Sequence, residues 1–558
     1  MMWRLAISLM AGAVAALADG VLTISMRSEP RTLNPVVAVD APSRELMRLL
    51  HGRLARIHGV THVVEPSLAT AWKFSSDGRS AVVTLRKGVT FSDGDPFDAD
   101  DVLFSFQVYL DGKVASPQRS LLMPGGKPVT AEKLTSHSIR LHFAEPHGPG
   151  ERMFDGIPIL PKHRLEGAYR EGKLAGMWTV SSAPGEIAGL GPFVMAQYAA
   201  GEKIVLKRNP RFWMRADGKA LPYLDEVRIV FTPDQTAEAL RFRAGEIDLI
   251  SRPPAQAFAS LGRDLKDHHF IDSGSSLEYH FVFFNLNDAP DRIPAAVAAR
   301  QKWFSEPRFR RAVSLAADRQ GMARLAFEGR ATPLAHHVTA GNRLWVSKDI
   351  RVPARSLEEG RRLLLAAGFR MEGSALVDSQ GKAVEFTLAY NSGNAQQGQM
   401  ATLLQEDLRP LGIRLRLAPL EFRALVNRVL KTLDYDAALM ALGSGDADPN
   451  AEMNVWHTSG AMHVWNLSAR NKPTAWEAEI DRHMRQQQST RDFAQRRKAY
   501  HRVQELVAEH LPILSLVSPN LLTAHRPGLE NVRPSILPPY ALWNIEQFRW
   551  ANGKGGAQ

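Results

Sequence analysis

Helical and strand patterns alternate between residues 356 and 442. Ser356 and Glu359 have the spacing of a capping box and open a helical pattern that Gly368 ends. The elements predicted after this helix are a strand at 384–390, a helix at 396–409, a strand at 413–417, a helix from Phe422 and an apolar strand at 437–442. This order is a βαβαβ unit, so we predict an α/β sheet with helices on its faces.

The chain is too long for one hydrophobic core. It has 558 residues, of which 44% are hydrophobic. Single cores stop growing at about 250–300 residues, so we expect two large lobes or more.

The first 18 residues have the order of a secretory signal peptide. Arg4 supplies a positive charge, residues 5–17 are apolar, and Ala16-Leu17-Ala18 is a small-x-small cleavage site. The apolar stretch is shorter than the roughly 20 residues that a membrane-spanning helix needs. We therefore expect residues 1–18 to be removed and the mature protein to be soluble and exported.

The sequence contains no cysteine. A lipoprotein carries its acyl chains on a cysteine at the cleavage point, so we expect no lipid anchor. Without thiols the chain forms no disulfides, and packing alone must stabilise the fold in an oxidising compartment. The sequence therefore predicts a protein that is free in the periplasm.

The formal net charge is +11, from 69 Lys and Arg against 58 Asp and Glu. The basic residues are dispersed in short groups and lack the interleaved aromatic residues of a groove for single-stranded nucleic acid. We therefore expect solvated basic faces and no nucleic-acid partner. The sequence does not decide whether these basic faces attract anionic ligands or the inner-membrane surface.

A strand, a turn and a capped helix follow one another within residues 68–110. Residues 81–85 alternate as in a strand, residues 92–94 form a turn, and Asp98 is placed as a helix N-cap with Asp101 three positions later. The segment reads A-x-x-W-x-x-S-x-D-G and then L-R-x-G-V-x-F-x-D-G-x-P-x-x-A-x-D-V. It resembles the signature of the peptide/nickel-type solute-binding proteins of ABC importers, extracellular solute-binding family 5.

Shorter matches follow in the family's order. They include I-L-P-K-H at 159–163, G-P-F at 191–193, F-R-A-G-E-I at 242–247, F-R-R-A-V-S-L-A-A-D-R at 309–319 and P-P-Y at 538–540, which resembles a returning strand. Each match is weak alone, but their number and order extend the resemblance from Leu22 to Trp550.

The resemblance implies a periplasmic binding protein-like α/β fold of the class II, or cluster C, type. Two α/β lobes then surround a cleft, with a smaller extra domain. We expect lobe I to be discontinuous, at 19–55, 170–275 and 508–550, the extra domain at 56–169, lobe II at 276–507 and a flexible tail at 551–558. The crossovers between lobes would be hinges, and closure around the ligand is the expected motion.

The loop at 443–460 is the strongest candidate for ligand contact. It follows the predicted strand 437–442, and ligands of α/β sheets bind beyond the carboxyl ends of strands. A carboxylate there could hold a ligand ammonium group, and an indole could cover apolar groups. The alternative is a polar connection in which Asp-Pro opens a helix. The candidate residues are Ser444, Gly445, Asp446, Asp448, Trp456 and His457.

The resemblance adds three site residues and shows one departure. Leu33 and Asn34 belong to an L-N-P loop that usually borders the cleft, and Asn285 is expected near its hinge side. In peptide-binding relatives an aspartate four positions before the loop's proline pairs with the peptide α-ammonium. Here that position is Gly445 and the acid is Asp446, so either the ammonium anchor is shifted or the ligand is not a simple peptide.

We expect no catalytic site, no metal and no cofactor. The sequence has no G-x-S-x-G, H-E-x-x-H, P-loop or dinucleotide glycine pattern. The acidic cluster from Asp93 to Asp101 lacks the EF-hand order, and turns and caps explain it better. Adjacent His336 and His337 would point to opposite faces of an extended segment, which does not favour shared metal ligation.

The resulting hypothesis is a monomeric periplasmic receptor of an ABC importer. It would bind dipeptides or oligopeptides in the cleft between the lobes and deliver them to an inner-membrane permease with its ATPase subunits. Relatives that carry nickel chelates, haem, sugars or opines keep a non-peptide ligand open. The alternatives of a different class are a peptide-sensing chaperone and a secreted hydrolase, because carboxylate-pair hydrolases need no local motif.

Overall fold

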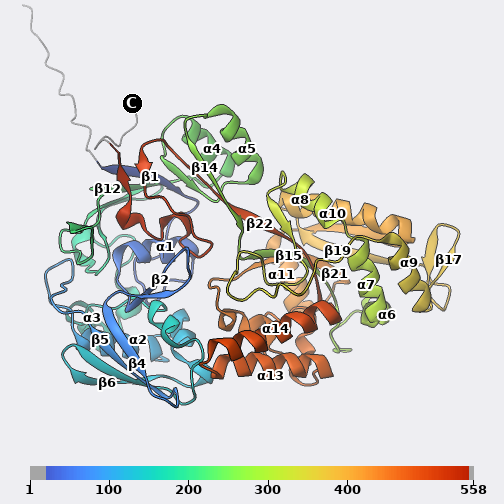
Figure 1. The fold of residues 1–558 in the computed structure, drawn as a ribbon, viewed down its shortest axis with the longest axis horizontal. Coiled ribbons are helices and arrows are strands. Elements are labelled where there is room, and N and C mark those ends of the chain that lie inside the picture. The colour runs from blue at the N-terminus through green and yellow to red at the C-terminus, as the bar shows by residue number, and fades with distance from the viewer. Residues whose placement is uncertain (1–19, 552–558) are drawn as a thin grey trace, which may run out of the picture.

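The computed structural model describes residues 20–551 as two lobes and a smaller domain (Figure 1). Lobe I and the extra domain lie on one side and lobe II on the other. The predicted signal peptide and residues 552–558 of the predicted tail lie outside the described residues. Within residues 20–551, no helix combines the length and the apolar character needed to cross a membrane.

The sheet of lobe I is built from distant parts of the chain. Its strands run in the order β22-β13-β1-β12-β9-β8, and β14 also pairs with β22. Strands β1 and β12 are parallel, although about 200 residues separate them in the chain. Lobe I contains β1 (Val21–Met26), α1 (Ala41–Leu50), β8 (Phe193–Ala199), β9 (Lys203–Arg208), β10 (Arg215–Ala216), β11 (Lys219–Ala220), β12 (Glu226–Phe231), α4 (Gln235–Arg243), β13 (Leu249–Ser251), α5 (Ala255–Asp264), β14 (His269–Ser275), β23 (Leu529–Glu530) and β24 (Arg549–Trp550).

The extra domain is an antiparallel sheet with helices packed on it. Its strands run in the order β4-β5-β7-β6. Asp98 caps α2 and forms a capping box with Asp101, which confirms the predicted helix start. One continuous hydrophobic core joins this domain to lobe I, so the two form a single packed body. Its elements are β2 (Ala55–Ile57), β3 (Val64–Pro66), β4 (Ala69–Phe74), β5 (Ser80–Leu85), α2 (Ala99–Leu110), β6 (Thr130–Thr135), β7 (Ser138–His142) and α3 (Lys162–Arg170).

Lobe II contains the predicted βαβαβ unit. Strands β20, β19 and β21 are parallel, and antiparallel β15 and β22 complete the order β20-β19-β21-β15-β22. Its elements are β15 (Glu278–Phe284), α6 (Ala295–Ser305), α7 (Pro307–Ala316), α8 (Arg319–Ala326), β16 (Ala331–Pro333), α9 (Leu357–Ala366), β17 (Arg370–Glu372), β18 (Ala375–Val377), β19 (Glu385–Asn391), α10 (Ala395–Leu408), β20 (Arg414–Leu420), α11 (Phe422–Asn427), β21 (Ala437–Gly443), α12 (Met453–Trp456), α13 (Ala475–Ser489) and α14 (Phe493–His510).

Alternate residues of the lobe II strands enter two separate cores. Val282 and Phe284 of β15 pack with α6 to α10, whereas Phe281 and Phe283 pack with α11 to α14. This is the period of two expected of a strand covered on both faces. One detail of the prediction was wrong: Ser356 caps α9, but the Glu359 side chain pairs with Arg362 at 2.6 Å and so does not complete a capping box.

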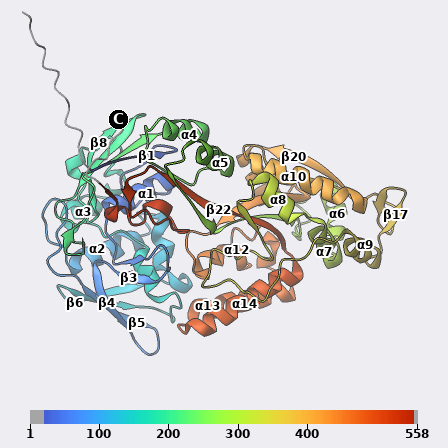
Figure 2. The same cartoon turned by 45° about the horizontal axis from the view of Figure 1, so that its top comes forward.

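Strand β22 (Ile513–His525) belongs to both lobes (Figure 2). Residues 513–517 pair with β15 of lobe II, and residues 522–525 pair with β13 and β14 of lobe I. The chain therefore passes between the lobes near Pro519, later than the expected boundary at 508. The second crossover is the short connection from β14 to β15, where the Ser276 amide donates to the Pro519 carbonyl at 2.9 Å.

The segment around Pro538-Pro539-Tyr540 is not the returning strand that the sequence suggested. It forms short 3-10 turns, at Tyr540–Leu542 and Ile545–Gln547, while β22 is the strand that returns to lobe I. Consecutive prolines lack amide donors, so this segment cannot supply a regular ladder of hydrogen bonds.

Candidate functional site

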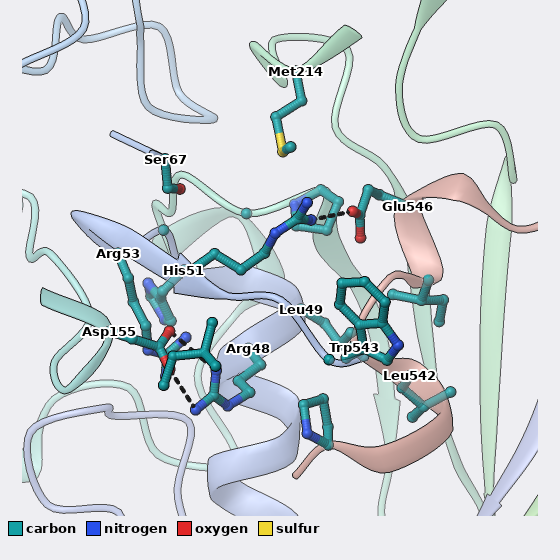
Figure 3. Close-up of a pocket in the computed structure, with 18 of the residues that line it drawn as sticks. Arg48, Leu49, His51, Arg53, Ser67, Asp155, Met214, Leu542, Trp543 and Glu546 are labelled. Carbon is teal, nitrogen blue, oxygen red and sulfur yellow. Dashed lines mark hydrogen bonds and ion pairs between the residues drawn. The ribbon is translucent and has the colours of Figure 1, made fainter. Parts of the chain in front are cut away.

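A cavity lies where lobe I meets the loop that follows β21 (Figure 3). It has about 910 Å³ of empty space, including the space at its mouth. Lobe I and the extra domain supply most of the wall, through residues 48–57, 190–192, 212–214 and 535–546, and Gly445 of lobe II completes it. A cavity bounded by both lobes can hold a ligand that both lobes contact.

Aromatic and aliphatic groups form part of the wall. Trp213 and Trp543 line it together with Met214, Leu537 and Leu542. The guanidinium of Arg86 lies 4.4 Å from the ring centre of Trp213, and that of Arg56 lies 5.6 Å from the ring centre of Trp543. These cation–π contacts hold the two indoles in place in the cavity wall.

Three arginines and two carboxylates also line the cavity. Arg48 contacts Asp155 at 3.3 Å, and Arg56 contacts Glu546 at 2.6 Å. Within residues 20–551, the Arg53 guanidinium makes neither an ion pair nor a hydrogen bond, and its Nε is buried without a partner. Burial lowers the pKa of Arg53 to about 10, so this side chain is still charged at neutral pH.

His51 stands beside Arg53 in the wall (Figure 3). It is 2% exposed, and its ring is stacked on Trp178 with the centres 5.7 Å apart. Neither ring nitrogen has a hydrogen-bond partner among the described residues. Burial lowers the pKa of His51 to about 3, with a smaller contribution from Arg53, so the ring is neutral and has one N–H donor.

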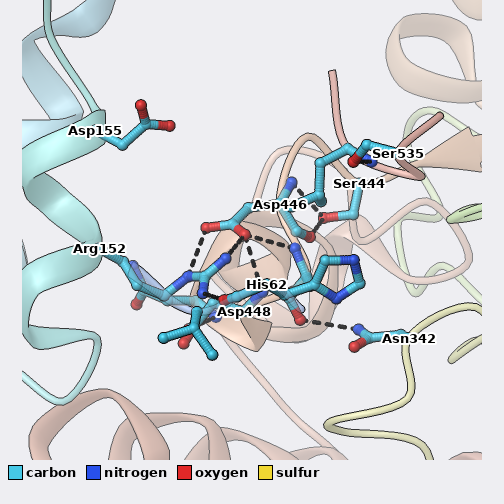
Figure 4. Close-up of polar contacts among 12 residues, drawn as sticks. His62, Arg152, Asp155, Asn342, Ser444, Asp446, Asp448 and Ser535 are labelled. Carbon is cyan, nitrogen blue, oxygen red and sulfur yellow. Dashed lines mark hydrogen bonds and ion pairs between the residues drawn. The ribbon is translucent and has the colours of Figure 1, made fainter. Parts of the chain in front are cut away.

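A bridge between the lobes lies next to the cavity (Figure 4). Arg152, in the short helix Gly150–Asp155 of the extra domain, donates from Nε to Asp446 Oδ2 at 3.0 Å, and its Nη2 contacts Oδ1. Arg152 also donates from Nη1 to the His62 carbonyl at 2.8 Å. Burial alone would lower the pKa of Arg152, but the Asp446 carboxylate outweighs it and raises that pKa. The Arg152 guanidinium therefore contacts both oxygens of the Asp446 carboxylate.

The bridge has a second part at the α13–α14 turn. The Gly148 amide donates to the Gln488 carbonyl at 2.6 Å, and Arg491 lies over the ring of Phe74, 3.5 Å from its centre. Arg491 also contacts Glu151 at 3.7 Å. The extra domain and lobe II therefore meet through polar and cation–π contacts.

Of the predicted loop residues, Ser444, Gly445 and Asp446 lie at the lobe boundary, and Asp448 lies just behind them (Figure 4). Gly445 lines the cavity, and a Cβ added there would meet no atom within 4 Å. The Ser444 hydroxyl donates to the Asp446 carbonyl at 2.5 Å, and Asp446 Oδ1 accepts from the Ala447 amide at 2.6 Å. These bonds hold the loop in a tight turn that directs Asp446 toward Arg152.

Asp448, Trp456 and His457 are held within lobe II. Asp448 caps the following turn and accepts from Arg496 at 2.8 Å. Trp456 is 0% exposed, donates to Glu452 at 2.9 Å and packs on His337. Arg485 Nη1 lies 2.8 Å from Nε2 of His457. Each of the three side chains therefore has a polar contact within lobe II, and its contact with a ligand stays a prediction.

Leu33, Asn34 and Asn285 are completely buried. The Asn34 amide donates to the Leu174 carbonyl at 2.8 Å, and the Asn285 amide donates to the Leu433 carbonyl at 2.9 Å. Both side-chain amides donate hydrogen bonds to backbone carbonyls of neighbouring loops, as buried amides usually do. Their predicted contact with a ligand therefore also remains a prediction.

Sequence reasoning missed Arg53, His51 and Arg152. The only signal for the first two is a polar H-G-R within the otherwise apolar stretch LLHGRLA at 49–55. Arg152 carries no local signal, because its partner is 294 residues away. Within residues 20–551, no cluster of three or more histidine and acidic side chains is arranged to hold a metal ion.

The sequence profile of the bacterial extracellular solute-binding proteins, family 5 (middle region), matches residues 63–463. This match covers well over half of the chain. The chain belongs to family 5. Family 5 is a family of binding proteins for solutes, and the α/β fold with two lobes is confirmed.

Three known proteins are similar to this chain over most of their length. A probable ABC transporter-binding protein of Deinococcus radiodurans is 27% identical over 78% of this chain and 77% of its own. The oligopeptide-binding protein AppA of Bacillus subtilis is 26% identical over 95% of this chain and 91% of its own. The crystal structure of NikA from Brucella suis in complex with Fe(III)-EDTA superposes with a TM-score of 0.79, at 21% identity, over 95% of this chain and 100% of that one.

Proposed function

We propose that this family 5 protein is the substrate-binding component of an ABC importer for peptides. It binds a dipeptide or oligopeptide in the cavity between its lobes and delivers it, chemically unchanged, to an inner-membrane permease with ATPase subunits. Membership of family 5 and the similarity to an oligopeptide-binding protein over nearly the whole chain support this proposal.

One observation carries the proposal: the cavity is bounded by lobe I and by Gly445 of lobe II, while β22 connects the lobes as a hinge. Ligand contacts made by both lobes exist only when the lobes are closed. A ligand therefore shifts the population toward the closed form by its difference in affinity for the two forms. The permease would recognise this closed shape, and no covalent step is needed.

We further propose that the protein works as a monomer in the periplasm, without a cofactor. Cell fractionation tests the location, and light scattering on the purified protein tests the monomeric state. Membrane association, or a stable oligomer, would contradict them.

The test of function is the identity of the bound molecule. Purified protein is incubated with a peptide library, recovered by size exclusion and denatured, and the released species are identified by mass spectrometry. We expect intact peptides from the wild type and far fewer from Gly445→Trp, whose side chain would fill the cavity. Cleaved products would favour a secreted hydrolase instead.

A thermal-shift measurement gives an independent readout. Free ligand at 100 times its dissociation constant stabilises the folded state by about 2.7 kcal/mol. Each recovered peptide should therefore raise the unfolding temperature of the wild type and leave that of Gly445→Trp unchanged.

The bridge at Asp446 favours a second candidate, a ligand without a peptide ammonium group. Arg152 occupies the carboxylate that would otherwise hold an ammonium. A non-peptide solute such as an opine, a haem, a sugar or a nickel chelate would need no such anchor. The test is to purify the protein from its native cells and to identify the molecule bound to it. A non-peptide solute of this kind, found without any peptide, would support this second candidate.

A further inference from the structure

The cavity wall carries one more positive charge than negative charge. Arg48 and Arg56 have carboxylate partners in the wall, Asp155 and Glu546, and Arg53 has none within 4.0 Å among the described residues. Arg53 is partly exposed, its Nε is buried without a partner among residues 20–551, and Asp155 attracts its charge only from beyond ion-pair distance. The described part of the chain therefore supplies the Arg53 guanidinium with no direct acceptor, although placing a charge away from water is costly without one.

The buried arginines Arg310 and Arg319 show what a structural role requires. Arg310 donates to the carbonyls of Phe304 and His510, at 2.6 and 2.8 Å. Arg319 donates to the Ser515 carbonyl at 2.8 Å and to the Ser314 carbonyl at 2.7 Å. Each guanidinium is surrounded by acceptors that the fold supplies. Arg53 lines a cavity and has no such acceptor among residues 20–551.

His51 adds a second group without a partner to the same place. Its ring is 2% exposed and neither nitrogen has a hydrogen-bond partner among the described residues. Arg53 and His51 both line the cavity. A cation and an imidazole N–H together are donors suited to a single anion.

We infer that Arg53 and His51 form a subsite for a carboxylate group of the cargo. The inference rests on the proposed function, since it names which part of the cargo lobe I recognises. The planar guanidinium can donate two parallel hydrogen bonds to a carboxylate, and the neutral imidazole can donate a third. Trp543 and Leu542, which line the same cavity, can cover the apolar part of the molecule.

This subsite gives the two lobes different tasks. Lobe I binds the negatively charged group of the cargo through Arg53. Asp446 of lobe II is paired with Arg152. The cargo is then selected by an anionic group and needs no ammonium partner at Asp446.

The first arm of the test needs no peptide. Isothermal titration compares 3-phenylpropionate with its uncharged amide, 3-phenylpropionamide, on the wild type, Arg53→Met and Arg79→Met. Arg79 is the matched control, because it is an exposed arginine of the extra domain that is remote from the cavity lining. We expect the wild type and Arg79→Met to prefer the acid by about tenfold or more, as a charged hydrogen-bonded pair would give. We expect Arg53→Met to lose this preference.

The second arm uses a tripeptide library in which half of the members are C-terminally amidated. Acidic side chains are present in half of each group, which separates a terminal carboxylate from a side-chain carboxylate. The wild type should retain peptides with at least one carboxylate. If no peptide is retained but the acid is preferred in the first arm, the peptide function fails and the subsite stands. If peptides are retained without regard to carboxylates, the subsite is overturned and the peptide function stands.

A folding defect in Arg53→Met would not block the test, because the preference of the wild type for acid over amide is measured without any variant. Equal affinity of the wild type for acid and amide overturns the inference. Equal preference for the acid in the wild type and a folded Arg53→Met overturns it as well. The unfolding temperature supplies a last readout: loss of an unpaired cation should leave it unchanged or raised, whereas loss of a structural arginine would lower it.

Discussion

Arg152 and Asp446 join the extra domain to lobe II through two nitrogen–oxygen contacts of one guanidinium with one carboxylate. The side chains retain only 12% and 27% exposure, so solvent screens the pair less than a surface ion pair. Because the extra domain shares its core with lobe I, this contact is a direct link between the two lobes.

Removal of Arg152 should open the unliganded protein. In Arg152→Met the Asp446 carboxylate loses its partner, so the closed form is disfavoured relative to the open form. Small-angle X-ray scattering should show a larger radius of gyration for Arg152→Met than for the wild type. In a double-mutant cycle with Asp446→Asn, measured by chemical unfolding, we expect a coupling energy of about 0.5–3 kcal/mol.

Arg140→Met is the control for this experiment. Arg140 pairs with Glu132 inside the extra domain at 2.7 Å, so its loss removes an ion pair that does not cross the lobe boundary. Its radius of gyration should match that of the wild type. An Arg152→Met protein as compact as the wild type would show that the bridge does not hold the lobes together.

Gly445→Trp should abolish ligand binding without unfolding the protein. An added Cβ at this position meets no atom within 4 Å, so the backbone accepts a side chain and the indole enters the cavity. The free energy of unfolding should change by no more than about 0.5 kcal/mol, as for an unhindered surface site. Gly185→Trp, at another glycine with open space, controls for the added indole. Unchanged affinity in Gly445→Trp would place the ligand elsewhere.

Trp456→Ala should lower stability and spare ligand recognition. The indole is 0% exposed and packs on His337 and Trp465 in the core of lobe II. Its removal should cost about 3–5 kcal/mol in the free energy of unfolding, measured with urea. At a temperature where the variant is folded, its affinity for the recovered ligand should equal that of the wild type. A selective loss of affinity would show that Trp456 contacts the ligand, as the sequence suggested.

The buried imidazole of His51 should make the protein sensitive to acid. Burial and Arg53 lower the pKa of His51 to about 3, whereas histidine in an unfolded chain titrates near 6.5. Below about pH 6.5 the unfolded chain therefore binds a proton that the folded protein does not, and this favours unfolding. The stabilisation is complete above pH 6.5 and is lost progressively toward pH 3.

The His51→Gln variant isolates this effect. Between pH 7 and pH 5, the wild type should lose about 2 kcal/mol more of its free energy of unfolding than the variant does. Urea unfolding at both pH values measures the difference. The same dependence on pH in both proteins would mean that His51 becomes protonated in the folded state.

The parts of the fold that follow from local pattern could be predicted from the sequence. The period of two in β19 and β20 and the helical period of α10 between them are properties of short segments, and both strands pair in parallel as expected. The capping box of α2 could be predicted for the same reason, since Asp98 and Asp101 lie in one turn.

The site could be predicted only in part, where the position of a loop in the fold indicates contact with a ligand. A loop after a parallel strand was enough to locate Ser444, Gly445 and Asp446. It could not distinguish these from Asp448, whose carboxylate pairs with Arg496 from a helix much later in the chain. Asn34 and Asn285 show the same limit, because an amide in a loop serves a ligand or a backbone carbonyl equally well.

Pro519 lies where β22 leaves the sheet of lobe II and enters that of lobe I. A proline has no amide hydrogen, so the strand donates no ladder bond at this residue. A backbone rotation at Pro519 therefore breaks no hydrogen bond donated by this residue. Because β22 is hydrogen-bonded into a sheet on both sides of Pro519, we expect the lobes to rotate about this residue and not to slide past each other.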